Sequence, residues 1–123
     1  FSSVLSFQLQ KPFLYLRKTE KEHGTGKRIE GLLLPGDRVL LVDDLVTTGQ
    51  SLLDSTDKLR AEGAVVEEAL VLIDREEGGI RSLAKKGVTV HALLKISEAA
   101  QILFDMGRID ERERNAILKQ KKT

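Results

Sequence analysis

The sequence predicts an α/β protein built on a doubly wound parallel sheet. Short apolar runs of strand length alternate at close intervals with stretches of helical periodicity. The clearest unit starts with the apolar run 39–42, continues through two carboxylates and a hydroxyl-rich turn, and ends in a helical pattern. Right-handed crossovers would bring the carboxyl ends of three strands to one sheet edge, where ligands bind in such folds. This arrangement would gather Arg17, residues 43–51 and Arg75 into one cleft.

The first predicted elements are a helix, a strand and a flap. Residues 2–9 are expected to form the end of a helix that Pro12 stops, and residues 13–16 a short strand. Residues 19–28 mix charges with glycine and threonine and show no apolar periodicity, so a flexible loop is expected there. Residues 29–32 would return as a second short strand and complete a hairpin-like flap.

The later elements continue the alternation. Strands are predicted at residues 65–73 and 88–94, and helices at 51–62, at 79–86, from the capping residue Ser97 to Gly107, and after a capping box of Asp110 and Glu113. The apolar face predicted for the helix that starts near Ser51 consists of Leu52, Leu53, Thr56 and Leu59. The runs 39–42 and 69–73 contain no polar residue, so each is expected to be buried on both sheet faces.

Composition narrows the class of protein. The 123 residues suffice for a single domain, and their formal net charge of +1 favours neither a nucleic-acid binder nor a membrane-surface protein. The absence of cysteine excludes a disulfide framework and a thiolate zinc site. No apolar run is long enough to cross a bilayer and no signal-peptide pattern is present, so a soluble cytoplasmic protein is expected.

The residues after the central apolar run suit a ribose 5-phosphate. Residues 47–51 offer three hydroxyls and a glycine at the start of a helix, where backbone N–H groups and the helix dipole favour a phosphate. Asp43 and Asp44 suit sugar hydroxyls, a hydrated Mg²⁺, or positive charge that develops on a ribose. The alternative is that Asp44 or Thr47 merely caps the helix, but one cap needs only one such residue.

Two further stretches carry charges that suit anions. The flap supplies a set of basic residues around two glycines, and these could close over a polyphosphate or form only a solvated charged hairpin: Arg17, Lys18, Lys21, His23, Lys27 and Arg28. Arg75 stands just past the predicted strand 65–73. Its guanidinium suits bidentate binding of a carboxylate or of a pyrimidine edge. The alternative is an ion pair with a neighbouring carboxylate, that of Asp74, Glu76 or Glu77.

Three stretches together resemble a known family. Val-Asp-Asp-Leu-Val-Thr-Thr-Gly-Gln-Ser at 42–51 resembles the phosphoribosyl pyrophosphate (PRPP) motif of type I phosphoribosyltransferases. Arg-Lys-Thr-Glu-Lys-Glu-His-Gly-Thr-Gly at 17–26 resembles the mobile catalytic loop of the orotate phosphoribosyltransferases, and Leu-Ile-Asp-Arg-Glu-Glu-Gly-Gly at 72–79 resembles their orotate-binding segment. The order and the spacings match as well. Residues 1–123 would then form a single partial domain that lacks the family's N-terminal part, with 17–31 as the mobile catalytic loop.

The resemblance implies a role for each matching residue. It implies that Lys21, Asp43 and Asp44 are catalytic, and that Thr47 and Arg75 bind orotate. The residues that it implies for PRPP are Arg17, Lys18, Lys21, His23, Asp43, Asp44, Leu45, Val46, Thr47, Thr48, Gly49, Gln50 and Ser51. It further implies a homodimer in which Lys21 and His23 act across the interface.

The implied reaction transfers ribose 5-phosphate from PRPP to orotate and gives orotidine 5′-monophosphate and pyrophosphate, in the biosynthesis of pyrimidines. The implied cofactor is Mg²⁺, held mainly through PRPP and water rather than by direct protein ligands. Two alternatives stay open at this point. One is another type I phosphoribosyltransferase with a purine as substrate, and the other is a non-catalytic nucleotide-binding fragment.

Overall fold

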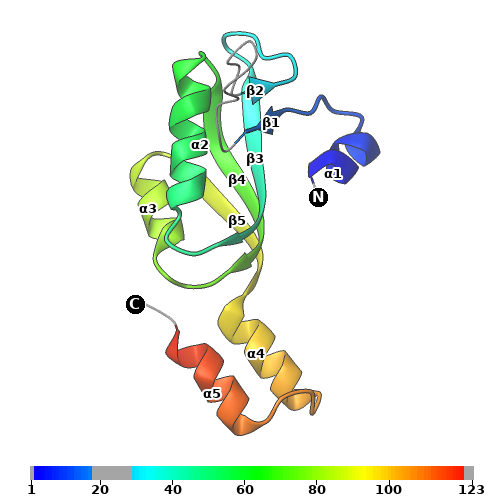
Figure 1. Cartoon of the computed structure of the whole chain (residues 1–123), viewed down its shortest axis with the longest axis vertical. Helices are drawn as coiled ribbons and strands as arrows, with labels where there is room; N and C mark the ends of the chain where they lie inside the picture. Colours follow the sequence, from blue (N-terminus) through cyan, green and yellow to red (C-terminus); the bar gives the residue numbers. More distant parts are fainter. Residues whose placement is uncertain (1, 18–28, 121–123) are drawn as a thin grey trace.

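A parallel sheet of three strands forms the centre of the computed structural model, which describes residues 2–17 and 29–120 (Figure 1). The strands lie in the order β3 (Arg38–Val46), β4 (Val65–Asp74) and β5 (Thr89–Lys95). The helices α2 (Gln50–Ala61) and α3 (Gly79–Lys85) connect them and lie on the same face of the sheet. The prediction of an α/β fold with a parallel sheet is therefore confirmed.

The hydrophobic core lies between this sheet and the two helices. Leu59 on α2 and Val71 on β4 have almost no exposed surface. The predicted buried face of α2 is confirmed, because Leu52 and Thr56 are buried and Leu53 packs against the core. The hydroxyl of Thr56 donates to the Leu52 carbonyl at 2.7 Å, so it carries no unmet hydrogen bond into the core.

Arg60 connects α2 to two other segments through hydrogen bonds. Its Nη2 donates to the Val66 carbonyl at 2.6 Å, and its Nη1 donates to the Lys86 carbonyl at 2.9 Å. The helix ends one residue later, and Gly63 follows with a φ of +89°. Glycine adopts this left-handed conformation without the steric cost of a side chain, so the predicted end of the helix is confirmed.

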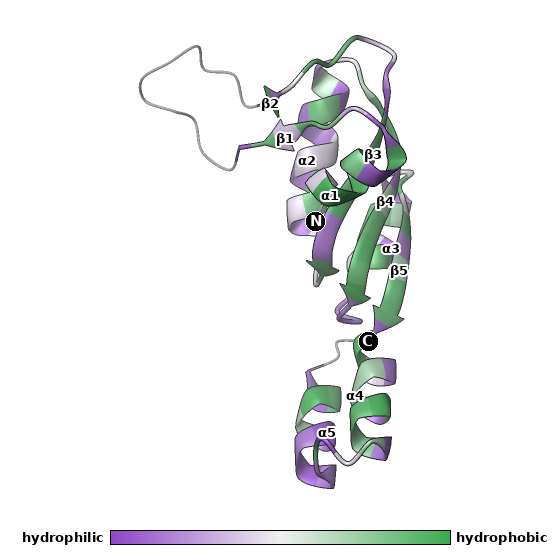
Figure 2. Ribbon diagram, turned by 90° about the vertical axis from the view of Figure 1, so that its right-hand side faces the viewer, coloured by the Kyte–Doolittle hydropathy of each residue, from purple (hydrophilic) through white to green (hydrophobic). Residues whose placement is uncertain are grey.

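The sheet face that α2 and α3 leave uncovered corrects one prediction. Leu40 is 47% exposed, so the run 39–42 is not buried on both faces. Leu93 on β5 is 67% exposed as well. Successive residues of a strand face opposite sides, and only the side of Leu41 meets the helices. Figure 2 shows the uncovered face, with largely apolar strands in front of α2 and α3. An apolar run predicts a preference for burial, but it does not supply the layer that would bury it.

A separate hairpin precedes the sheet. Strands β1 (Tyr15–Leu16) and β2 (Ile29–Glu30) pair antiparallel, with Leu16 opposite Ile29. The predicted flap is thereby confirmed at its base, although both strands are shorter than expected. Helix α1 (Ser2–Leu9) precedes the hairpin, also as predicted, and none of its residues is buried.

Two helices at the C-terminal end form an arm beyond β5 (Figure 1). They are α4 (Ile96–Asp105) and α5 (Glu111–Lys119). The predicted capping box of α5 is confirmed, because the Glu113 N–H donates to Asp110 at 2.8 Å and the Asp110 N–H donates to Glu113 at 2.9 Å. Ser97 does not cap α4, because this helix follows β5 directly and its N-cap is Lys95. No helix in the described part of the chain has the length and apolarity of a membrane span.

Candidate active site

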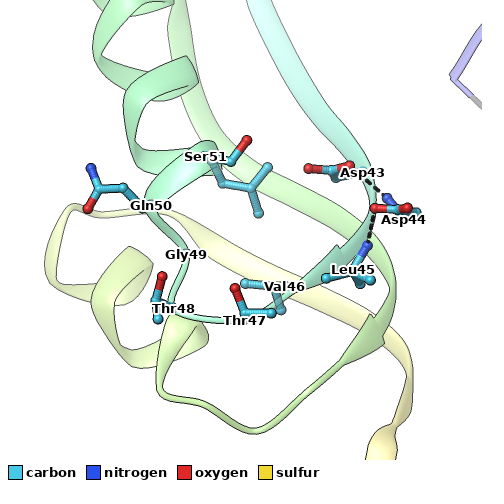
Figure 3. Close-up of a pocket in the computed structure, with 10 residues that line it drawn as sticks. Asp43, Asp44, Leu45, Val46, Thr47, Thr48, Gly49, Gln50 and Ser51 are labelled. Atoms are coloured by element: carbon cyan, nitrogen blue, oxygen red, sulfur yellow. Dashed lines mark hydrogen bonds between the residues drawn. The ribbon is translucent and has the colours of Figure 1, made fainter. Parts of the chain in front are cut away.

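The carboxyl end of β3 opens into a hollow of about 240 Å³ that residues 43–52 line (Figure 3). The strand ends at Val46, and residues 47–49 turn the chain into α2. Gly49 is the N-cap of this helix and has a φ of +86°. The hollow therefore lies at the sheet edge where the sequence predicted it, between the end of a strand and the start of a helix.

Two glycines hold this loop by direct backbone contact. The N–H of Gly79, the first residue of α3, donates to the Thr47 carbonyl at 2.9 Å. A Cβ added to Gly79 would lie 2.5 Å from that carbonyl oxygen, and one added to Gly49 would lie 3.0 Å from the Gly79 oxygen. The loop can pack this closely against α3 only because both positions lack a side chain. Sequence reasoning missed this role of Gly79, although the Gly78-Gly79 pair was its signal.

The two carboxylates of β3 extend in different directions. Figure 3 shows Asp43 reaching toward Ser51, whereas Asp44 extends away from the loop. Asp43 Oδ1 accepts the Asp44 N–H at 2.9 Å, and Asp44 Oδ1 accepts the Leu45 N–H at 2.8 Å. Each hydrogen bond fixes one carboxylate oxygen against the backbone. Asp43 is half-buried and Asp44 is exposed, as expected for neighbours on a strand.

No side chain caps the N-terminus of α2. The alternative in which Asp44 or Thr47 serves only as the helix cap is therefore wrong. The first N–H groups of a helix have no partner within it, so those of α2 are available to an anion in the hollow. Thr47 and Thr48 offer hydroxyls from the turn, and Ser51 offers one from the first turn of α2. Gln50 points outward and donates to Asp54 at 2.7 Å.

Arg75 joins this edge of the sheet through its backbone. Its N–H donates to the Val46 carbonyl at 2.9 Å, directly beside the loop. Its side chain is 35% exposed, and its Nη2 lies 3.1 Å from Glu77 Oε1 and donates to Gln120 Oε1 at 2.9 Å. The ion pair left open by the sequence is thus present, with Glu77 as the partner. Gln120 lies 45 residues along the chain, so no sequence pattern pointed to it.

The basic residues of the flap are only partly described. Arg17 pairs with Glu30 on β2. Since β1 belongs to the two-stranded hairpin and not to the parallel sheet, the prediction that three parallel strands gather Arg17, Asp43 and Arg75 is wrong for Arg17. Lys18, Lys21 and His23 lie outside the described residues.

The donor set for a metal ion is small in the described ranges. No three His, Cys, Asp or Glu side chains come together there as a metal-binding group. The oxygens of Asp43 and Asp44 are hard ligands of the kind that Mg²⁺ prefers, and Mg²⁺ commonly takes one or two carboxylates with phosphate and water oxygens as its remaining ligands. The residues present therefore fit Mg²⁺ that arrives with a phosphorylated substrate.

Comparison with known proteins assigns the family. A model of the family described as "Phosphoribosyl transferase domain" matches residues 1–101. The chain belongs to the phosphoribosyltransferase family. This phosphoribosyltransferase chain is similar to the orotate phosphoribosyltransferase of Saccharolobus solfataricus, with 41% identity over 117 residues that make up 95% of the chain and 60% of the relative.

Two solved structures resemble the phosphoribosyltransferase chain described here. The orotate phosphoribosyltransferase of Aeropyrum pernix matches 88% of this chain and 59% of its own, with a TM-score of 0.72 and 39% identity. That of Mycobacterium tuberculosis H37Rv in complex with PRPP matches 72% of this chain and 49% of its own, with a TM-score of 0.62 and 26% identity. The chain thus spans between 49% and 60% of the length of these relatives.

Proposed function

We propose that this chain carries the substrate-binding core of an orotate phosphoribosyltransferase. The reaction is a pentosyl transfer, in which ribose 5-phosphate moves from PRPP to N1 of orotate and pyrophosphate leaves. The observation that carries the proposal is the hollow at the end of β3, where hydroxyls and a helix N-terminus suit a phosphate and carboxylates suit a ribose. The names of the Saccharolobus and Aeropyrum relatives support orotate as the acceptor, and the Mycobacterium complex supports PRPP as the donor.

The loop 47–51 would bind the 5-phosphate of PRPP. The hydroxyls of Thr47, Thr48 and Ser51 would donate to the phosphate oxygens, together with the N–H groups at the start of α2. Asp43 and Asp44 would accept hydrogen bonds from the ribose hydroxyls. As the bond between ribose C1 and pyrophosphate breaks, positive charge develops on the ribose, and these carboxylates stabilise that charge.

The flap would act on the other end of PRPP. We assign residues 17–31 as a catalytic loop within a single partial domain, residues 1–123. Lys21 would neutralise the leaving pyrophosphate, with Arg17, Lys18 and His23 as further contacts to PRPP. In a homodimer, Lys21 and His23 would reach the active site of the neighbouring subunit.

The acceptor would bind beside the loop. Arg75 would grip the carboxylate of orotate, and Thr47 would lie near the base. Mg²⁺, when bound, supplies charge that neutralises the pyrophosphate oxygens, and it would be held mainly by PRPP and water with Asp43 and Asp44 nearby. With this reaction, the protein would act in pyrimidine biosynthesis, and we propose that it does so in the cytoplasm.

Forward turnover tests the proposal. The 123-residue chain is mixed with PRPP, orotate and Mg²⁺, and the loss of orotate absorbance is followed. We expect turnover that Lys21→Ala abolishes, while Lys85→Ala, a control at an exposed lysine of α3, leaves it unchanged. Turnover that is the same in Lys21→Ala and in the unchanged chain would remove the catalytic role of Lys21.

A second measurement distinguishes the alternatives. Absence of turnover with saturable binding of orotidine 5′-monophosphate, lost in Arg75→Ala, would indicate a nucleotide-binding fragment. Displacement of bound orotate by adenine or another purine would indicate a purine phosphoribosyltransferase. Absence of both turnover and nucleotide binding would contradict the proposed function altogether.

A further inference from the structure

We propose that Gln120 is a positioning residue that competes with the carboxylate of the ligand for Arg75. The inference rests on the proposed function, because it takes orotate or orotidine 5′-monophosphate as that ligand. In the structure, Gln120 Oε1 accepts a hydrogen bond from Arg75 Nη2 at 2.9 Å, and Glu77 Oε1 lies 3.1 Å from the same nitrogen. One guanidinium nitrogen thus serves two partners.

The position of Nη2 in the guanidinium decides how Arg75 can bind a further carboxylate. A guanidinium binds a carboxylate through two parallel N–H groups, either Nη1 with Nη2 or Nε with Nη2. Both pairs include Nη2, which carries only two hydrogens. Gln120 Oε1 accepts from one of them, and Glu77 Oε1 forms an ion pair at 3.1 Å from the same nitrogen. Two oxygens thus already lie within 3.1 Å of Nη2, and a carboxylate that takes a bidentate position on Arg75 has to displace one of them.

Gln120 is the partner that leaves more easily. The side chain of Glu77 is only 15% exposed, and its carboxylate forms an ion pair with the guanidinium, which is a charged contact and is screened little by solvent. Gln120 offers a neutral amide from the exposed C-cap of α5. An incoming carboxylate exchanges this neutral acceptor for a charged one and keeps the pair with Glu77.

The fold keeps Gln120 at this position. Glu76 Oε2 accepts the N–H of Ser97 at 3.0 Å, which ties the loop that contains Arg75 to the first turn of α4. The guanidinium carbon of Arg114 on α5 lies 4.4 Å from the centre of the Phe104 ring on α4, which holds the two helices together. Release of Arg75 thus needs only a rotation of the Gln120 side chain.

Two nucleotides and two substitutions test the inference. Orotidine 5′-monophosphate and uridine 5′-monophosphate differ only in the carboxylate, so titration calorimetry with both isolates the grip of Arg75. Gln120→Ala is expected to tighten binding of orotidine 5′-monophosphate by roughly five-fold, the equivalent of one net hydrogen bond. Gln120→Glu is expected to weaken it, because a second carboxylate would hold Nη2 more strongly. Binding of uridine 5′-monophosphate should change in neither variant.

Gln101→Ala is the matched control. Gln101 is an exposed glutamine of α4 that donates to Asp105 at 2.8 Å, so its removal tests the loss of a glutamine from the arm without touching Arg75. The affinity of Gln101→Ala for orotidine 5′-monophosphate should equal that of the unchanged chain.

Each outcome has a separate meaning. Tighter binding in Gln120→Ala with weaker binding in Gln120→Glu supports the competition. Orotidine 5′-monophosphate that binds equally to the unchanged chain and to Gln120→Ala overturns the inference and leaves the proposed function standing. Absence of binding for both nucleotides overturns the proposed function together with the competition.

Discussion

The N–H of Gly79 donates to the carbonyl of Thr47 at 2.9 Å and joins the start of α3 to the loop that follows β3. This contact places the start of one helix against the loop that leads into another, beside the hollow proposed for PRPP. The geometry of the loop therefore depends on a residue 32 positions further along the chain.

Gly79→Ala should distort the loop and weaken nucleotide binding. The added Cβ would lie 2.5 Å from both the Thr47 carbonyl oxygen and Cγ2 of Val46, so the loop or α3 has to move. Overpacking of this kind costs about 1–3 kcal/mol of stability. Chemical denaturation and the affinity for orotidine 5′-monophosphate measure both effects.

Gly36→Ala is the control for this substitution. Gly36 has a φ of +88° but no atom within 4 Å of an added Cβ, so it tests the cost of backbone strain alone. We expect a loss of roughly 1 kcal/mol with unchanged nucleotide affinity. Equal affinities in Gly79→Ala and Gly36→Ala would contradict the role of the Gly79 contact.

Asp43→Asn should lower the affinity for orotidine 5′-monophosphate by at least about ten-fold, because a hydrogen bond to a charged group contributes more than one to a neutral amide. The amide oxygen of asparagine can still accept the Asp44 N–H, so the end of the strand should keep its shape. Asp57→Asn, at an exposed position of α2, is the control. An unchanged affinity in Asp43→Asn would exclude Asp43 from ribose binding.

Arg60→Ala should destabilise the fold without any direct effect on the hollow. The substitution removes the donors of the part-buried Val66 carbonyl and of the exposed Lys86 carbonyl. Loss of the partner of the Val66 carbonyl should cost about 1 kcal/mol or more, whereas water can replace the donor at Lys86. Thermal and urea unfolding measure the loss. Lys58→Ala on the same helix should stay within about 0.5 kcal/mol of the unchanged chain, and an equal loss in both variants would argue against the Arg60 contacts.

Asp110→Ala should loosen α5. The Asp110 side chain accepts the Glu113 N–H at 2.8 Å, and the loss of such a cap costs about 1 kcal/mol. Amide exchange over residues 111–119 should quicken, while the exposed Arg112→Ala should leave it unchanged. Exchange that is unaltered in Asp110→Ala would mean that contacts to α4 alone hold the helix.

The sequence was informative at several positions where neighbouring residues decide the structure. The end of α2 at Gly63 and the capping box of Asp110 both depend on neighbouring residues, and both are confirmed. The loop 47–51 also lies where its pattern predicted it, at the end of β3. Which of its residues bind PRPP stays a prediction.

Most failures concern what distant segments contribute, whereas the wrong cap at Ser97 is a local one, because α4 follows β5 directly. The exposure of Leu40 depends on whether a second layer covers its face of the sheet, and a run of apolar residues carries no such information. The membership of β1 in a separate hairpin depends on its pairing with β2. The contact between Arg75 and Gln120 depends on the path of the whole C-terminal arm.

The uncovered sheet face has a practical consequence for anyone who follows the unfolding of this chain. Dyes that fluoresce on apolar surfaces report unfolding only when the folded state hides such surfaces. Here the folded chain already presents Leu40 and Leu93, so such a dye should be bright before any heating. The chain also has no tryptophan and a single tyrosine, which leaves little intrinsic fluorescence. Circular dichroism of the helices is therefore the suitable signal for its melting curve.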